Sequence, residues 1–326
     1  MSLKLCLLLL LFRATIGTTP SSFDSIDEGY QIWARRMGSS YGLGSGSSFY
    51  GSLIKKAKNR LKPCLRLVSK KPRSIAFASV GVALRSVPIV NNCWVVISIS
   101  AGTYQKVEIP ATMAYVTAKE AGADKTVIEW DDTADRIGPD GRPLGTFASA
   151  TFANKAPLLA SGALGKQAVA LRMSVDAEAS VECCFIGSQD TLYDHVGRHY
   201  FRDCNIEGSV DFAFGNALSF YRGCRLHGAS SSYRAVMAQK RESLLDRAWG
   251  TFSRVVFAHA YMDRNVTTKG WFDWGDKNRD MTVFYGRYKS MGPGASSGGR
   301  VPWSRELTPE EAMPFVSLDF IGAQAP

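Results

Sequence analysis

Two aspartates, Asp190 and Asp211, occupy matching positions in a repeated sequence pattern. Each is the third residue after a glycine, in the stretches GSQD and GSVD. If those positions lie on neighbouring strands, their carboxylates are about 5 Å apart. Like charges at that separation raise the pKa of one acid and leave the other ionised, so one can donate a proton while the other attacks. The competing interpretation is that both aspartates only cap a turn.

The pattern that positions these aspartates occurs three times, as CCFIG, CNIEG and CRLHG, beginning at Cys183, Cys204 and Cys224. Each copy reads Cys, any residue, a large apolar residue, any residue, Gly, and the copies begin 21 and 20 residues apart. A fixed period near twenty, with β-branched and aromatic segments between the copies, is typical of a stacked β-solenoid. The sequence therefore predicts an all-β fold in which equivalent residues stack from coil to coil.

The three repeated cysteines share one coil position, which predicts a ladder of small interior residues. A disulfide between adjacent coils is the alternative in an oxidising compartment. The sequence has no CxxC pair, and its four histidines lack partners at metal-ligand spacing, so we expect neither a metal nor another cofactor. His195 and His199 bracket Val-Gly-Arg, which indicates a structural turn between strands.

The N-terminus has the layout of a secretory signal peptide over residues 1–17: Lys4, an apolar run over 5–12, Arg13 and then small residues. No later segment approaches the roughly 20 apolar residues that a membrane span needs. Residues 18–60 are rich in Ser, Gly and Tyr, which predicts a flexible leader. We therefore expect a secreted protein with one folded domain over residues 61–326.

The net charge of the chain indicates which class of partner it binds. Removing residues 1–17 takes two of the 39 basic residues and none of the 29 acidic ones, which leaves a net charge of +8. Export and the lack of a compact DNA-reading motif argue against nucleic acid, and a basic surface favours an anionic extracellular polymer. Asn265 begins a glycosylation sequon that an exported chain could use.

Short helices are expected at both ends of the solenoid. Residues 79–85 could form a helix that covers the open first coil. Near the C-terminus, Thr308-Pro309-Glu310-Glu311 combines an N-cap residue, a proline and an acidic first turn, which predicts a short helix over 307–313.

Longer motifs carry a family resemblance from about residue 50 to the C-terminus. The stretches GKQAVALR, GSQDTLYDHVGRHYFRDCNIEGSVDFAFGNALSFYRGC, RAWGTFSRVVFAHAYMD and KGWFDWGDKNRDMTVFYGRY strongly resemble plant pectinesterases, the pectin methylesterases. The resemblance implies a single-stranded right-handed parallel β-helix, the pectin-lyase-like solenoid. It also implies hydrolysis of methyl-esterified galacturonan in the cell wall to pectate and methanol.

The same resemblance implies roles for individual catalytic residues. Asp211 in DFAFG is similar to the nucleophile, and Asp190 in SQDT to the general acid and base. Gln189 and Gln167 resemble the amides that stabilise the developing oxyanion. Arg247 in RAWG is similar to the arginine that keeps the nucleophile ionised and oriented.

Substrate contacts and partners are implied as well. Trp249 and Trp271 resemble aromatic residues on which sugar rings stack, and Thr146 falls where the family has a substrate-contacting threonine. The implied partners are methyl-esterified pectin and proteinaceous pectinesterase inhibitors, with no nucleic acid and no membrane, and the protein is expected to be a monomer.

Two segments are shorter than the family pattern. Gln239 and Arg247 are eight residues apart, and eight extended residues reach at most about 28 Å, whereas the family places a further coil of about twenty residues here. This predicts that Arg247 is displaced from Asp211 and that the stack either closes up or is locally disordered. About half a coil, with the strand of the form ITFRN, is missing between residues 151 and 167, and Asp246 replaces the usual glycine.

Three functions therefore compete. An active carbohydrate esterase is favoured by the intact aspartate pair. A catalytically impaired wall-binding protein is favoured by the deletion before Arg247. Another pectin-active β-helix, such as a lyase or a polygalacturonase, is disfavoured because a lyase needs clustered carboxylates for Ca²⁺.

Overall fold

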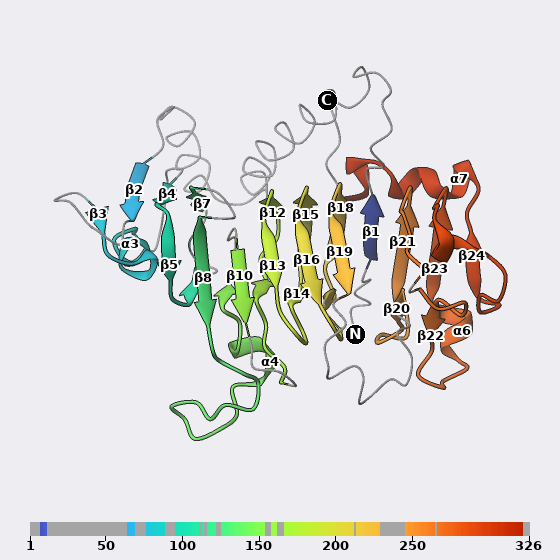
Figure 1. Cartoon of the computed structure of the whole chain (residues 1–326), viewed down its shortest axis with the longest axis horizontal. Coiled ribbons are helices and arrows are strands. Elements are labelled where there is room, and N and C mark those ends of the chain that lie inside the picture. Colours follow the sequence, from blue (N-terminus) through green and yellow to red (C-terminus); the bar gives the residue numbers. More distant parts are fainter. Residues whose placement is uncertain are drawn as a thin grey trace, which may run out of the picture.

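The computed structural model describes residues 7–11, 64–68, 76–88, 95–110, 113, 116–121, 125–153, 158–161, 166–211, 213–228, 245–264 and 266–321. Its strands stand side by side along the long axis of the molecule (Figure 1). Every pair of strands in the described residues is parallel, and successive strands of one coil belong to different sheets. The predicted parallel β-helix is confirmed.

Two long sheets form two faces of the solenoid. The seven-stranded sheet consists, in spatial order, of β12 (Glu178–Val181), β15 (Arg198–Arg202), β18 (Leu218–Arg222), β1 (Leu7–Leu11), β21 (Arg254–Ala258), β23 (Phe284–Tyr288) and β24 (Ser304–Glu306). The six-stranded sheet consists of β19 (Arg225–Gly228), β16 (Asn205–Gly208), β13 (Cys184–Ile186), β10 (Leu158–Ser161), β8 (Thr126–Trp130) and β5 (Gly102–Tyr104).

Smaller sheets complete the coils. The five-stranded sheet consists of β17 (Ala213–Gly215), β14 (Leu192–Asp194), β11 (Leu171–Met173), β9 (Phe152–Ala153) and β6 (Val107–Glu108). A four-stranded sheet at the N-terminal end contains β3 (Ala76–Phe77), β2 (Cys64–Val68), β4 (Val95–Ile99) and β7 (Val116–Glu120), and a two-stranded sheet contains β20 (Asp246–Arg247) and β22 (Trp271–Phe272).

The cysteine repeat marks one corner of each coil. Glu182, Asp203 and Gly223 immediately precede the repeated cysteines and turn the chain with φ values of 55°, 54° and 63°. Cys204 and Cys224 are 1% exposed, which confirms the interior ladder at these two coils, whereas Cys183 is half-buried against the core. Cys183, Cys184, Cys204 and Cys224 are not disulfide-bonded, so no disulfide links these coils. Burial raises the pKa of the Cys204 thiol, which keeps it protonated and inert.

The core repeats from coil to coil because side chains alternate across each strand. Phe185 pairs in register with Ile206 and Ile206 with Leu226, and the first two are fully buried. Phe201 and Tyr221 stack with their ring centroids 4.4 Å apart. Such ladders bury apolar surface continuously along the axis, so each coil stabilises its neighbours.

Both predicted terminal helices are confirmed. Helix α3 (Val80–Arg85) begins at Ser79, whose hydroxyl accepts a hydrogen bond from the Val82 amide, and buries three apolar residues at the first coils. Helix α7 (Pro309–Ala312) begins at Thr308 with a capping box to Glu311. The other short elements are α4 (Gly145–Ala148), α6 (Arg279–Thr282), η1 (Pro293–Ala295), η2 (Met313–Phe315) and η3 (Leu318–Ile321). None of the helices in the described ranges is long and apolar enough to cross a membrane.

The N-terminal strand β1 occupies the place in the seven-stranded sheet where the shortened coil leaves room for one strand. Leu7 pairs with Leu218 of β18 on one side and with Arg254 of β21 on the other. In the seven-stranded sheet, β1 therefore lies between the strands that were expected to close up or be disordered, and residues 236–239, on which that prediction falls, lie outside the described residues. An open position between two parallel strands exposes unpaired N–H and C=O groups, which an added extended segment satisfies.

Strand β1 lies within the segment predicted to be a signal peptide, so a chain cleaved after Gly17 would not contain it. The predicted leader over 18–60, Gln239 and Asn265 lie outside the described residues.

Two strands lie in the second shortened segment, between residues 151 and 167. Strand β9 joins the five-stranded sheet, and β10 lies between β8 and β13 in the six-stranded sheet. Residues 154–157 and 162–165, on which the rest of the prediction of a lost half-coil falls, lie outside the described residues.

Candidate active site

The aspartate pair sits where two adjacent coils enter the five-stranded sheet. Asp190 precedes β14 and Asp211 precedes β17, and the Asp190 amide donates a 3.1 Å hydrogen bond to the Val210 carbonyl. Gln189 forms a parallel bridge with Val210, so the residues that follow them are also aligned. Both aspartates have left-handed backbones, with φ values of 67° and 47°. The two side chains therefore start from equivalent positions on neighbouring strands, whose backbones are about 5 Å apart.

The two acids differ in their surroundings. Asp190 is 4% exposed, whereas the Asp211 side chain is 20% exposed. Burial, and then the negative charge of Asp211, raise the pKa of Asp190 to about 7. A carboxylic acid that keeps its proton near neutral pH can act as a general acid. This contrast is the electrostatic separation expected of an acid and a nucleophile.

Two glutamines continue the aspartate row toward the N-terminal end of the solenoid. Gln167 pairs with Gln189 in an isolated parallel bridge, and the Ala168 amide donates a 3.2 Å hydrogen bond to the Gln189 carbonyl. Gln167 is exposed and Gln189 is half-buried. The structure thus brings together both predicted amides and both aspartates on neighbouring coils.

Arg247 approaches Asp211 from the far side of the shortened segment. Its Nη2 atom lies 3.6 Å from Asp211 Oδ1. The prediction that the deletion displaces Arg247 from Asp211 is therefore wrong. Strand β20 is held by pairing with β22 and belongs to a different sheet from β17. The long arginine side chain crosses the space between them, so the ion pair does not require a complete coil.

The two predicted sugar-stacking tryptophans have different environments. Trp249 is 66% exposed and packs edge to face on Trp274, which is 42% exposed, with ring centroids 5.3 Å apart. Trp271 is only 1% exposed, donates a 3.0 Å hydrogen bond to Ser304 Oγ and packs on Tyr285. The expectation for Trp271 is corrected: on β22 it points inward while Phe272 points outward, because strand side chains alternate.

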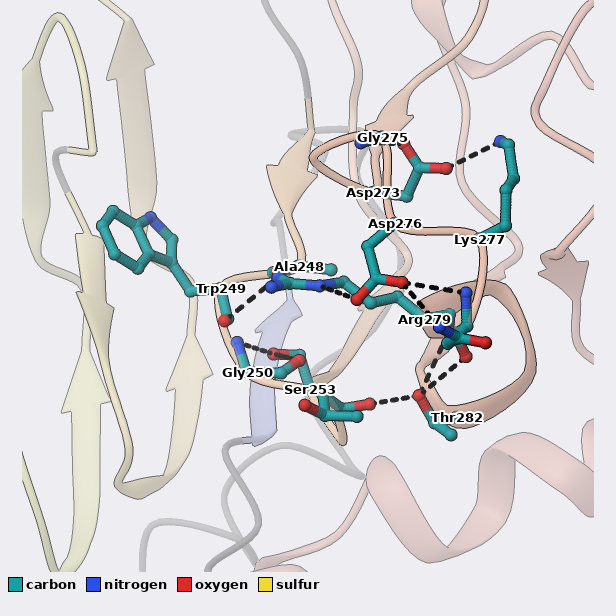
Figure 2. Close-up of polar contacts among 12 residues, drawn as sticks. Ala248, Trp249, Gly250, Ser253, Asp273, Gly275, Asp276, Lys277, Arg279 and Thr282 are labelled. Carbon is teal, nitrogen blue, oxygen red and sulfur yellow. Dashed lines mark hydrogen bonds and ion pairs between the residues drawn. The ribbon is translucent and has the colours of Figure 1, made fainter.

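The loop that carries Trp249 is braced by helix α6 (Figure 2). Arg279 donates hydrogen bonds to the carbonyls of Ala248 and Trp249 and pairs with Asp276 at 3.3 Å. Within the loop, the Gly250 amide donates to Ser253 Oγ at 3.1 Å. These bonds hold the backbone directly after Arg247, so Arg279 positions both the arginine and the exposed tryptophan.

The sequence profile of the pectinesterase family matches residues 67–241 and 224–324. The chain belongs to the pectinesterase family. Pectinesterase QRT1 of Arabidopsis thaliana is 38% identical over 280 residues, covering 74% of this chain and 73% of that protein. Pectinesterase 31 of the same plant is 36% identical over 287 residues, covering 75% and 88%.

Solved structures agree with this membership. Pectin methylesterase from carrot matches with a TM-score of 0.71 at 27% identity, covering 81% of this chain and 94% of that one. A pectin methylesterase in complex with a hexasaccharide shares the fold, with a TM-score of 0.64 at 22% identity and coverage of 80% and 98%.

An aromatic row flanks the acidic pair of this pectinesterase. Tyr193 and Phe214 each lie three residues after an aspartate, and their rings stack 4.7 Å apart. Tyr193 also contacts His195 at 4.9 Å, and His195 contacts Phe147 edge to face at 5.5 Å. This row was not predicted from the sequence, although the repeat that aligns the two aspartates also aligns Tyr193 with Phe214.

The two histidines that were predicted to be structural, His195 and His199, have different environments. His199 is fully buried and hydrogen-bonds to Asp194 and to the Val175 carbonyl. His195 is only half-buried and joins the aromatic row, with Nδ1 3.2 Å from Ser174 Oγ. His199 therefore serves the core, whereas His195 faces the row.

Thr146 lies at the N-terminal end of the aromatic row, in the short helix α4. It is half-buried, and its carbonyl accepts a 3.0 Å hydrogen bond from Ser149 Oγ. Its neighbour Phe147 is 50% exposed and closes the row. Helix α4 thus adds an aromatic wall beside the position where a substrate-contacting threonine was expected.

Proposed function

We propose that this pectinesterase removes methyl groups from esterified galacturonan in the plant cell wall, with Asp211 as nucleophile and Asp190 as general acid and base. The observation that carries the proposal is the pairing of a buried acid whose pKa is raised to about 7 with a more exposed aspartate beside Arg247. One group holds a proton at neutral pH while the other is placed next to a cation. That is the division of roles that ester hydrolysis through a covalent intermediate requires.

In the first step, a carboxylate oxygen of Asp211 attacks the carbonyl carbon of the methyl ester. Gln189 and Gln167 donate hydrogen bonds to the oxyanion that forms. The bond from carbon to the methoxy oxygen then breaks, and Asp190 gives its proton to the departing methanol. An acyl anhydride between Asp211 and the uronate remains.

In the second step, water attacks the anhydride carbonyl while the Asp190 carboxylate removes one of the water protons. The bond to Asp211 breaks, which releases a galacturonate carboxyl group and restores the Asp211 carboxylate and protonated Asp190. Arg247 orients Asp211 throughout by the ion pair between the two side chains. Trp249 and Trp274 offer exposed apolar faces to sugar rings, and Thr146 lies at the opposite end.

Features of the sequence, as well as family membership, support pectin as the polymer and the cell wall as the compartment. The apolar run at the N-terminus supports export, and the net charge of +8 after removal of residues 1–17 favours an anionic polysaccharide over a neutral one. Proteinaceous pectinesterase inhibitors are the proposed protein partner of the monomer.

Methanol release from methylated pectin tests the proposal directly. Purified protein should release methanol at a rate proportional to its concentration, and Asp211→Ala should release none while keeping the far-ultraviolet circular dichroism of the wild type. Retention on pectin without any methanol release by the wild type would instead support the alternative of a catalytically impaired wall-binding protein.

A further inference from the structure

A cluster of four polar side chains is buried inside the solenoid, close to the coils that carry the acidic pair. Asp194 and Glu178 are buried, and His199 and Tyr221 are fully buried. His199 precedes the core residue Phe201 by two positions on β15, so both point to the inner face of the sheet. None of the roles proposed for the aspartates, glutamines or tryptophans uses this cluster. Charged groups in a protein interior are costly unless they are paired, so the cluster needs an explanation.

Both ring nitrogens of His199 face hydrogen-bond acceptors. Nδ1 is hydrogen-bonded to Asp194 Oδ1, and Nε2 lies 2.8 Å from the Val175 carbonyl oxygen. A carbonyl oxygen only accepts, so Nε2 carries a hydrogen. An ionised carboxylate also only accepts, so Nδ1 carries a hydrogen as well. The geometry therefore favours an imidazolium ring paired with the Asp194 carboxylate, whose other oxygen accepts a 2.7 Å hydrogen bond from the Tyr221 hydroxyl group.

The charges around the ring support this protonation. Burial by itself would lower the pKa of His199, but the charge and hydrogen bond of Asp194 and the charge of Glu178 raise it above its ordinary value. Glu178 Oε2 lies 3.6 Å from Nε2. Asp176 and Arg198, the nearest charged residues of the adjoining turns, form a separate ion pair at 2.6 Å. The imidazolium is therefore held between two carboxylates.

The backbone of Asp194 fixes the distance between the two coils of the acidic pair. Asp194 lies four residues after Asp190, and its register partner Gly215 lies four residues after Asp211. The Asp194 carbonyl accepts a 3.0 Å hydrogen bond from the Asn216 amide. Gly215 has a φ of 144°, and a Cβ there would lie 1.7 Å from the Asp194 carbonyl oxygen, so only glycine allows this approach.

The Asp194 side chain makes a second connection between the same two coils. His199 on β15 belongs to the coil of Asp190, whereas Tyr221 on β18 belongs to the coil of Asp211. The carboxylate of Asp194 accepts hydrogen bonds from both of these side chains. Asp194 therefore joins the two coils through its backbone and its side chain together.

We propose that Asp194 and His199 are positioning residues for the reaction, with Tyr221 completing their buried ion pair. This pair holds the coil of Asp190 against the coil of Asp211. The inference rests on the proposed function, because it gives these residues a part in the same reaction without any contact with the substrate. Where the pair is broken, water reaches Asp190 and the charge of Asp211 acts on it from further away. Both changes lower the pKa of Asp190, which then lacks its proton at neutral pH.

Tyr221→Phe tests the connection between the coils with the smallest change. It removes the hydroxyl group that bonds to Asp194 and keeps the ring that stacks on Phe201. We expect kcat for methanol release to fall about tenfold or more with KM unchanged, since small displacements of reacting groups cost up to about 10²-fold. Tyr200→Phe is the matched control, because it removes a hydroxyl group from an equally buried tyrosine in the outer cluster of the same sheet. It should leave kcat unchanged, and an equal loss in both variants would overturn the proposal.

Two substitutions of Asp194 separate its hydrogen bonds from its volume. Asp194→Asn can donate from its amide to Nδ1 of a neutral His199 and accept from Tyr221, so kcat should stay within about threefold of the wild type. Asp194→Leu is similar in size but neither donates nor accepts, so it should lower kcat by about 10²-fold. Equal rates in these two variants would contradict a positioning role.

The pKa of Asp190 is a readout that a purely structural role would not move. Carboxyl ¹³C spectra of the wild type should titrate Asp190 with a midpoint of about 7. Tyr221→Phe and Asp194→Leu should lower that midpoint by about one pH unit or more. A lower melting temperature with an unchanged midpoint would show that the cluster only stabilises the fold, which would overturn the proposal. If Asp194→Leu does not fold, Tyr221→Phe still decides the outcome.

Ring ¹⁵N spectra test the buried ion pair itself. Both nitrogens of His199 should carry hydrogens at neutral pH in the wild type, and only one should do so in Asp194→Asn. A neutral His199 ring in the wild type at that pH would overturn the ion pair.

The positioning role and the proposed function can fail separately. Methanol release with a kcat and an Asp190 midpoint that ignore Tyr221→Phe and Asp194→Leu would remove the positioning role alone. A wild-type protein that releases no methanol, but whose Asp190 midpoint falls in Tyr221→Phe, would keep the positioning of the acids and remove the esterase activity.

Discussion

Arg247 Nη2 lies 3.6 Å from Asp211 Oδ1, although the chain between their strands is shorter than the family pattern. The guanidinium comes from β20, which pairs with β22 and belongs to a different sheet from β17, the strand that follows Asp211. The ion pair therefore depends on side-chain reach and on the anchoring of β20, and not on an unbroken stack of coils. Substitution of Arg247 therefore tests whether the active site is functional despite the shortened segment.

The first prediction concerns Arg247. Arg247→Met should lower kcat by about 10²-fold or more, because Asp211 loses the cation that pairs with its carboxylate and orients it. Arg247→Lys should recover part of the rate, since it keeps the charge but loses the paired donors. Steady-state methanol release measures both. Unchanged kcat in Arg247→Met would show that the ion pair has no part in the reaction.

The second prediction concerns the proton on Asp190. Asp190→Asn should reduce the rate by about 10²- to 10⁴-fold, since the amide cannot transfer a proton. In the wild type, the first chemical step should slow as pH rises through about 7, where Asp190 loses its proton. A pre-steady-state burst of methanol measured across pH isolates that step. A burst rate that does not change between pH 6 and 8 would contradict the assignment of Asp190 as the acid.

The same raised pKa predicts a pH effect on stability, with a sign opposite to the usual one for an aspartate. Folding raises the pKa of Asp190 from 3.8 to about 7, so the folded state binds more protons than the unfolded state between these values. The free energy of unfolding therefore falls as pH rises from 4 to 7, by roughly 4 kcal/mol for this group. Denaturant unfolding of Asp190→Asn should lack that loss. Parallel pH profiles of the two proteins would contradict it.

The fourth prediction compares two tryptophans, one buried and one exposed. Trp271→Ala should destabilise the protein by about 3–5 kcal/mol, because a fully buried ring leaves a cavity. Trp249→Ala should change stability by no more than about 0.5 kcal/mol and should raise KM, since its exposed ring is free to contact substrate. Thermal unfolding and methanol-release kinetics measure the two effects. A large loss of stability in Trp249→Ala, with unchanged KM, would reverse the assignments.

The fifth prediction concerns β1. The chain over residues 18–326, which export with cleavage would produce, lacks the strand between β18 and β21 and should be less stable by several kcal/mol, because two strand edges lose their partners. Leu9→Pro in the full chain should also destabilise, since proline cannot donate in a central strand. Leu9→Val keeps the backbone donor and is the control.

Thermal unfolding of these four proteins, each checked by intact mass, measures the contribution of β1. Equal melting temperatures for the full chain and for residues 18–326 would show that the N-terminal segment adds nothing to the folded domain.

The sequence by itself determined the solenoid and the pairing of Asp190 with Asp211. Both follow from a fixed period, because a chain that repeats every coil must stack equivalent residues on neighbouring strands. The same period predicts the cysteine ladder and also the stacking of Tyr193 on Phe214. The terminal helices follow instead from the open first coil and from the capping residues at Thr308 to Glu311.

Only the tertiary structure decided what happens where the period breaks. Two of these features join segments that are distant in the sequence: the ion pair of Arg247 with Asp211, and the insertion of β1 between β18 and β21. A third, the burial of Trp271, depends on which way a short strand faces. No local pattern encodes such contacts, because they are set by which unpaired edges and apolar faces remain open after the regular coils have stacked.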